Sequence, residues 1–237
     1  MNGPPPADTL LAALTRLAAL EPAQAALCAD GHSWCTRAEL LAWARAAACP
    51  EPPAVEVSGP RPWVGRVAAR DVPAADPLGA VLALVAAEDA RSVPVVRDPD
   101  WPAEIVAAQV ALAERLGGSW PADPGEPAAV LAVGVPEHVL VGGWDAASLL
   151  VLPTSGSSAV PRLVVRTARS WLDSLAPFSA VTGIGREDVV WAPGPPAATL
   201  TLFAIWHALA GGLPVIASGR WRGVVPAGPV AAEADVV

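Results

Sequence analysis

A run of small hydroxyl residues around one glycine is the part of the sequence best suited to chemistry. It occupies residues 153–162 and reads Pro-Thr-Ser-Gly-Ser-Ser-Ala-Val-Pro-Arg, between apolar runs that predict strands at Leu149–Leu152 and Leu163–Arg166. Such a loop can offer several backbone N–H groups and up to four hydroxyls to an anion, and Arg162 adds a positive charge. The residues alone leave two interpretations open, a phosphate-binding loop or an ordinary polar hairpin turn.

A serine hydrolase site is a weaker candidate. Ser155 or Ser157 would have to meet His207 and Asp188, but the Gly-x-Ser-x-Gly sequence is absent and three such residues occur in most chains by chance. We therefore expect His207 to be a packed core residue or a polar cap within its helix.

The cysteines and histidines predict no metal site. Cys28, Cys35 and Cys49 fit no zinc spacing, and the three histidines are scattered, so small buried thiols are expected. Residues Met1–Pro6 lack the features of a signal peptide, and no uncharged apolar run reaches the ~18 residues of a membrane span. The sequence therefore predicts a protein of the reducing cytoplasm with no membrane contact.

Charge and composition exclude several kinds of chemistry. The chain has fifteen basic residues, all arginine, so no lysine can serve as a Schiff-base amine or phosphate-binding ammonium. A net charge of −8 without an arginine cluster argues against a nucleic-acid partner. Since 53% of the residues are hydrophobic and 16% charged, we expect either Ala and Pro to cover much of the surface or part of it to be covered by a partner.

Strands and helices alternate in the second half of the chain, which predicts mixed, partly parallel α/β sheets covered by helices. Capping signals begin helices at Asp8 or Thr9, at Thr36 (with Glu39) and at Asp76-Pro77, and Thr167 is expected to begin another. The remaining expected helices are Ile105–Leu116 and Thr199–Ala210. The expected strands are Ala25–Cys28, Ser33–Cys35, Val64–Ala68, Ser92–Val96, Ala129–Val133, Val139–Val141, Leu149–Leu152, Leu163–Arg166, Asp188–Ala192, Leu213–Ala217 and Ala234–Val237.

The hydroxyl-rich segment resembles the signature of the adenylate-forming (ANL) superfamily. That superfamily of AMP-dependent synthetases and ligases includes acyl-CoA synthetases, peptide-synthetase adenylation domains and luciferases, and its signature is Ser/Thr-Ser-Gly-Thr/Ser-Thr/Ser-Gly-x-Pro-Lys. Ala159 stands in place of the second glycine and Arg162 in place of the lysine. The matching positions are Thr154, Ser155, Gly156, Ser157, Ser158, Val160 and Pro161.

Other segments resemble the family in the same order along the chain. Pro22–Ala48 is similar to its entry hairpin and threonine-capped helix, Asp76–Val95 to the helix and strand that follow, and Asp188–Ile216 to the strand-helix-strand unit after the phosphate loop. The resemblance implies the N-terminal portion of such a ligase. It implies an α/β subdomain over residues 1–150 and a strand-helix subdomain over residues 151–237, without the small C-terminal lid domain.

By this resemblance, the phosphate-loop residues would bind ATP, with magnesium, while a carboxylic acid is activated to an acyl-adenylate. Those residues are Thr154, Ser155, Gly156, Ser157, Ser158 and Arg162. Ala159 cannot cheaply adopt the positive φ or allow the close phosphate approach that glycine permits. The family's aromatic-His pair corresponds here to Gly194-Pro195-Pro196.

Two functions follow from the resemblance. The first is an acid-activating ligase that is incomplete or inactive alone, because the family's catalytic lysine and its adenine and ribose motifs are not found. The alternative is a non-catalytic, ligase-like domain that serves as a binding or assembly partner in a biosynthetic pathway. We also expect a homodimer or a second protein to cover the sheet edge at Ala234–Val237.

Overall fold

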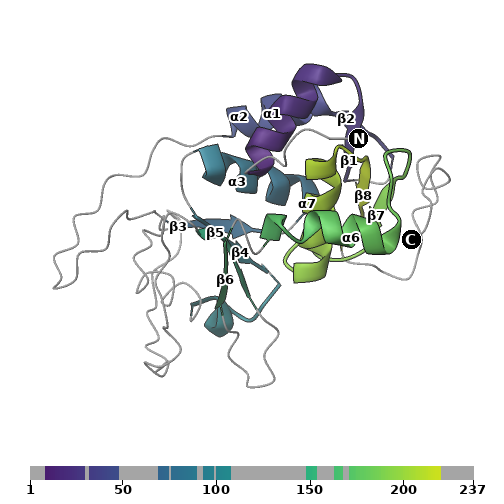
Figure 1. Ribbon diagram of the computed structural model, residues 1–237. Coiled ribbons are helices and arrows are strands. Elements are labelled where there is room, and N and C mark those ends of the chain that lie inside the picture. The colour runs from purple at the N-terminus through teal and green to yellow at the C-terminus, as the bar shows by residue number, and fades with distance from the viewer. Residues whose placement is uncertain are drawn as a thin grey trace, which may run out of the picture.

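The computed structural model describes residues 9–29, 32–47, 69–74, 76–89, 93–98, 100–107, 148–153, 163–167 and 171–219. Within these residues the strands form two sheets, and the helices pack around them (Figure 1). The helices are α1 (Leu10–Leu20), α2 (Arg37–Ala46), α3 (Pro77–Asp89), α6 (Leu175–Thr182) and α7 (Thr199–Gly211). The strands are β1 (Ala25–Cys28), β2 (Cys35–Thr36), β3 (Ala69–Pro73), β4 (Val93–Arg97), β5 (Ser148–Pro153), β6 (Leu163–Thr167), β7 (Val190–Ala192) and β8 (Val215–Ala217).

Both sheets are partly parallel, as the sequence predicts. The first has the order β2-β1-β8-β7, in which β1, β8 and β7 are parallel and β2 is antiparallel to β1. The second has the order β3-β4-β5-β6, in which only β6 is antiparallel. Each sheet combines strands from before and after residue 150, and the division of the chain at that residue stays a prediction.

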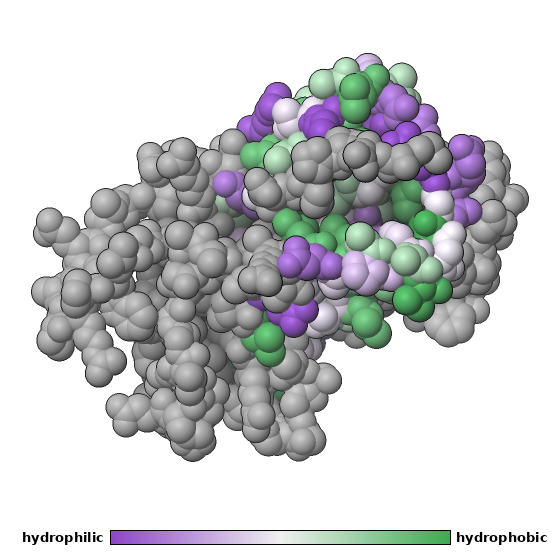
Figure 2. Space-filling view, in the orientation of Figure 1, coloured by the Kyte–Doolittle hydropathy of each residue, from purple (hydrophilic) through white to green (hydrophobic). Residues whose placement is uncertain are grey.

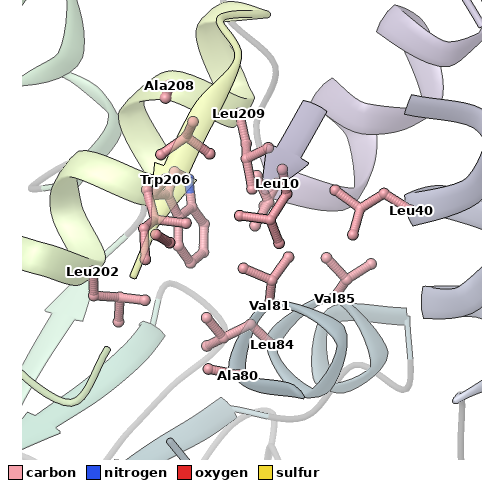
Figure 3. Close-up of a cluster of buried hydrophobic side chains, with 14 of the residues drawn as sticks. Leu10, Leu40, Ala80, Val81, Leu84, Val85, Leu202, Trp206, Ala208 and Leu209 are labelled. Carbon is pink, nitrogen blue, oxygen red and sulfur yellow. The ribbon is translucent and has the colours of Figure 1, made fainter. Parts of the chain in front are cut away.

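A layer of apolar helices joins the two sheets. Helix α3 packs on β3 and β4, α7 packs on β7 and β8, and α1 contacts α2, α3 and α7 (Figure 1). Figure 3 shows side chains from all four helices meeting in one buried cluster. The labelled members are Leu10, Leu40, Ala80, Val81, Leu84, Val85, Leu202, Trp206, Ala208 and Leu209. Since α3 and α7 are apolar on almost every side, their burial between other elements is what their sequences favour.

The capping signals in the sequence mark the true starts of three helices. The Thr9 hydroxyl accepts a hydrogen bond from the amide of Ala12 at 3.0 Å, at the start of α1. Thr36 and Glu39 form the expected reciprocal capping box of α2. At the start of α3, Asp76 Oδ1 accepts from the amide of Gly79 at 2.7 Å.

None of the described helices combines the length and apolar character needed to cross a membrane.

Thr167, the expected cap of the next helix, is the last residue of β6 and pairs with Ser148 of β5. Residues 168–170 lie outside the described residues, Trp171 and Leu172 are helical, and α6 follows at Leu175–Thr182. The structure therefore has helix in the expected segment, and the cap at Thr167 stays a prediction.

Several expected elements lie outside the described residues. These are the strands at Val64–Ala68, Ala129–Val133, Val139–Val141 and Ala234–Val237, and most of the helix Ile105–Leu116. A described strand, β3, follows the first of these positions at Ala69–Pro73. The dimer or second partner expected at Ala234–Val237 stays a prediction.

The two described cysteines are buried thiols outside any disulfide, as expected. Cys28 packs with Ile216, Trp34 and Trp191, while Cys35 belongs to the main core cluster with the helices. Burial raises the pKa of the Cys35 thiol, which keeps it protonated and unreactive at neutral pH. Cys49 lies outside the described residues.

The buried guanidinium of Arg37 connects three helix ends. Its Nη1 lies 2.5 Å from Glu21 Oε2, at the C-terminal end of α1, and its Nη2 donates to the carbonyl oxygen of Gly212 at 2.6 Å, at the end of α7. Gly212 has a φ of +77°, and a Cβ there would lie 3.0 Å from Leu17 Cδ2 and 3.3 Å from Arg37 Nη2. Glycine at this position therefore permits both the helix stop and the close approach of Arg37.

We predict that Arg37→Met lowers the free energy of unfolding by roughly 1–3 kcal/mol, because the Gly212 carbonyl loses its donor. The Glu21 side chain is 60% exposed, so solvent compensates for most of the lost ion pair. Urea denaturation followed by tryptophan fluorescence measures the change. Arg45→Met, on the exposed side of α2, is the matched control and should change stability by at most about 0.5 kcal/mol. Equal stability of the two variants would contradict a stabilising role of the hydrogen bond between Arg37 and the Gly212 carbonyl.

Candidate functional site: a hydroxyl-rich segment between β5 and β6

The β5–β6 hairpin holds the two ends of the predicted phosphate loop side by side. Pro153, the last residue of β5, pairs with Leu163, the first residue of β6. Residues 154–162 themselves lie outside the described residues, and with them all six predicted ligand residues. These are Thr154, Ser155, Gly156, Ser157, Ser158 and Arg162, so the structure describes the frame of this site and the ligand residues stay a prediction.

The segment leaves the second sheet at the carboxyl edge of its parallel strands. Pro73 of β3 pairs with Arg97 of β4, and the pairing of Val95 with Val151 brings Pro153 of β5 to the same level. Ligands of open α/β sheets bind outside the carboxyl ends of the strands. The hydroxyl-rich segment therefore begins where this type of sheet ordinarily binds its ligands.

Strand β5 is a rigid base for the start of the segment. Leu150, Val151 and Leu152 are fully buried, and β5 lies between two hydrogen-bonded neighbours. At the same edge, the buried Asp98 follows β4 directly and its Oδ1 accepts from the amide of Asp100 at 3.0 Å. The chain after β4 is thus turned by its own side chain, next to the point where β5 ends.

The far end of β6 is fixed by an aromatic cluster on α7. The guanidinium carbon of Arg166 lies 5.5 Å from the ring centroid of Trp171, which is buried. Trp171 meets Phe203 and Trp206 edge to face, with centroid distances of 5.2 and 6.2 Å. The hairpin is therefore tied to the first sheet through α7 as well as to its own sheet.

His207 is a packed core histidine, as expected, and its described partner is Ser179 on α6. His207 Nε2 lies 2.7 Å from Ser179 Oγ, and the ring packs against Phe178 at a centroid distance of 4.9 Å. Asp188 instead accepts from the amide of Gly185 at 2.6 Å and closes the turn before β7. Among the described residues, His207 and Asp188 therefore do not form the catalytic pair that a hydrolase requires.

The hydrogen bonds around Ser179 define the state of the histidine ring. Ser179 Oγ donates to the carbonyl of Leu175 at 3.2 Å, so it accepts from His207 Nε2–H. Burial lowers the pKa of His207, opposed by a hydrogen bond to the Leu175 backbone, and the ring is neutral. The sequence of α6 is uncharged and none of its residues is fully buried. The Ser179–His207 hydrogen bond is therefore a polar contact that attaches α6 to α7. Figure 2 shows mostly pale and green side chains over the same helix.

The lowered pKa of His207 predicts a loss of stability in acid. The folded state binds a proton less readily than the unfolded state, so this contribution is complete above about pH 6.5 and declines as the pH falls below it. His207→Gln keeps a donor for Ser179 and should reduce the fall in unfolding free energy between pH 7 and 5. The measurement is urea denaturation across that range, with the exposed His32→Gln as control. If the two variants show the same pH profile, His207 does not supply the effect.

A close contact that the sequence does not reveal lies after β7. Gly194 is buried, and a Cβ there would clash with Thr201 Oγ1 in the first turn of α7. This glycine therefore lets α7 begin directly beside the strand.

Among the described residues, no group of three His, Cys, Asp or Glu side chains is placed to hold a metal ion.

Comparison with known proteins finds a likeness in structure alone. No family model matches the sequence, and no curated protein matches it. An O-succinylbenzoate coenzyme A synthetase from Bacillus subtilis, in complex with AMP, superposes with a TM-score of 0.63 at 17% identity. The N-terminal domain of FACL13 from Mycobacterium tuberculosis gives 0.64 at 16% identity, and a fatty acyl-adenylate ligase from L. pneumophila, with acyl adenylate and pyrophosphate, gives 0.63 at 15%.

These matches cover most of this chain but only part of each neighbour. They include 88%, 90% and 89% of this chain, and 56%, 57% and 40% of the three neighbours in the same order. At such low identity the likeness shows a shared fold. The predicted fold class, a mixed and partly parallel α/β architecture like that of ligase domains, is thereby confirmed.

Proposed function

We propose that the chain is the phosphate-binding portion of an adenylate-forming ligase, which activates a carboxylic acid with ATP. One observation carries the proposal: the segment with the superfamily signature joins β5 to β6 at the carboxyl edge of a sheet whose fold matches such ligases. Structures with this fold hold AMP in one case, and acyl adenylate with pyrophosphate in another. A nucleotide and a carboxylic acid are accordingly the proposed ligands.

The donor set of the segment suits phosphate oxygens. In this reaction class, a carboxylate oxygen attacks the α-phosphorus of ATP, and pyrophosphate leaves with the electrons of the broken P–O bond. Negative charge on the β- and γ-phosphates would be bound by the hydroxyls of Thr154, Ser155, Ser157 and Ser158, with Arg162 as the cation. Arginine supplies a planar fork of donors where the family has a lysine. No described residue is assigned to magnesium.

Binding is the direct test, since the chain spans about half the length of two of the neighbours. We expect calorimetry to show ATP binding, and Arg162→Gln to weaken it roughly 10–100-fold, as expected for losing a charge-assisted hydrogen bond. Arg186→Gln, in the exposed turn before β7, is the control and should leave the affinity unchanged. No binding of ATP at millimolar concentration would reject the proposal. Binding without pyrophosphate exchange would instead favour a non-catalytic, ligase-like domain.

Ala159 offers a test in the opposite direction. If the loop needs a positive φ at this position, Ala159→Gly removes a strain of about 1–2 kcal/mol and should raise the affinity for ATP by about 5–30-fold. Ala47→Gly, at the exposed end of α2, is the matched control because glycine is well tolerated there. A weaker or unchanged affinity in Ala159→Gly would show that the loop does not require glycine geometry.

A further inference from the structure

Asp98 is a buried carboxylate that the proposed chemistry does not use. It is 7% exposed and directly follows β4, at the carboxyl edge of the second sheet. Its Oδ1 accepts from the amide of Asp100 at 3.0 Å, and its backbone carbonyl accepts from the amide of Trp101 at 3.2 Å. A buried carboxylate is costly unless several donors surround it, and its two oxygens can accept more hydrogen bonds than its own turn supplies.

The strand register places Asp98 beside the beginning of the hydroxyl-rich segment. Val95 of β4 pairs with Val151 of β5 in parallel. Two residues further along both strands, Arg97 lies level with Pro153, the last residue of β5. Asp98 is therefore the first residue beyond the sheet on the strand next to the one that the segment leaves, and neighbouring strands are about 4.8 Å apart.

Pro153 weakens the backbone ladder at this point. Proline has no N–H, so Pro153 donates no hydrogen bond to a neighbouring strand. On one side Pro153 still pairs with Leu163 of β6. On the other side β4 has ended, and the turn closed by Asp98 takes its place. This turn is therefore the part of β4 that the segment meets as it leaves the sheet.

We infer that Asp98 is a positioning residue for the hydroxyl-rich segment, whose carboxylate fixes the turn after β4 and the start of the segment beside it. The inference rests on the proposed function of the segment as a phosphate-binding loop. Asp98 acts through the backbone of the segment and does not itself bind phosphate, because a carboxylate would repel the phosphate oxygens. Its acceptor oxygens suit the amides and hydroxyls with which the segment begins, at Thr154 and Ser155.

Two variants separate the geometry of Asp98 from its charge. Asp98→Asn removes the charge but keeps an oxygen at the position of Oδ1, whereas Asp98→Glu keeps the charge and moves the carboxylate by one methylene. Because the inferred role depends on where the acceptor lies, Asp98→Asn should bind ATP within about 3-fold of the unchanged chain and Asp98→Glu about 10-fold more weakly. Calorimetry with the full chain measures both affinities.

Asp188→Ala is the matched control. Asp188 Oδ2 accepts from the amide of Gly185 at 2.6 Å, a turn hydrogen bond of the same kind, in the turn that precedes β7 of the other sheet. Its loss should leave the affinity for ATP unchanged. Unchanged affinity in Asp98→Glu, a loss in Asp98→Asn as large as in Asp98→Glu, or an equal loss in Asp188→Ala would overturn the inference.

A measurement without nucleotide tests Asp98 separately from the proposed function. Backbone amide relaxation in the nucleotide-free chain, measured by NMR, reports the order of the amides of Thr154 and Ser155. Their order parameters should fall in Asp98→Glu and keep their values in Asp98→Asn. Equal order parameters in the unchanged chain and both variants would overturn the positioning role, whether or not the chain binds ATP. The expected order parameters in a chain that does not bind ATP would support that role and reject the phosphate-binding function alone.

Discussion

The contact between the Arg37 guanidinium and two helix ends is the constraint on which the joining of the two sheets depends. Arg37 begins α2, Glu21 follows α1, and Gly212 ends α7. The last carbonyls of a helix have no partner within it, so the arginine satisfies one that would otherwise be buried without a donor. Because α7 packs on β7 and β8, and α1 contacts α3, which packs on the other sheet, this contact fixes how the helix layer meets both sheets.

The same helix layer determines where the hydroxyl-rich segment lies. Trp171 follows β6 closely in sequence, lies under Arg166 of β6 and packs on Phe203 and Trp206 of α7, so the hairpin is packed against α7. The buried β5 then presents the start of the segment at the carboxyl edge of the parallel strands. A loop that binds a ligand needs a rigid scaffold to position it, and the two strands supply that scaffold at both ends of the segment.

Sequence patterns predicted local features well and distant contacts poorly. The helix caps could be predicted because a cap and its helix are neighbours in sequence. They are Thr9, the Thr36–Glu39 capping box and Asp76. The pairing of Thr167 with Ser148 could not be predicted, because it depends on another strand. Neither the contact of Arg37 with Gly212 nor that of Glu88 with Leu11 could be recognised, since the partners lie 175 and 77 residues apart. The hydroxyl-rich segment was found through its residue types and its resemblance to a family signature, while its position at the sheet edge required the fold.

The pairing of β1 with β8 has a consequence for synthesis of the chain. Leu27 pairs with Val215, so the first sheet joins strands from distant parts of the sequence. When β1 leaves the ribosome, its parallel partner has not yet been made, and the apolar face of α1 lacks α7 as well. The early part of the nascent chain must therefore remain unassembled, with its apolar segments open to chaperones, until most of the chain has been translated.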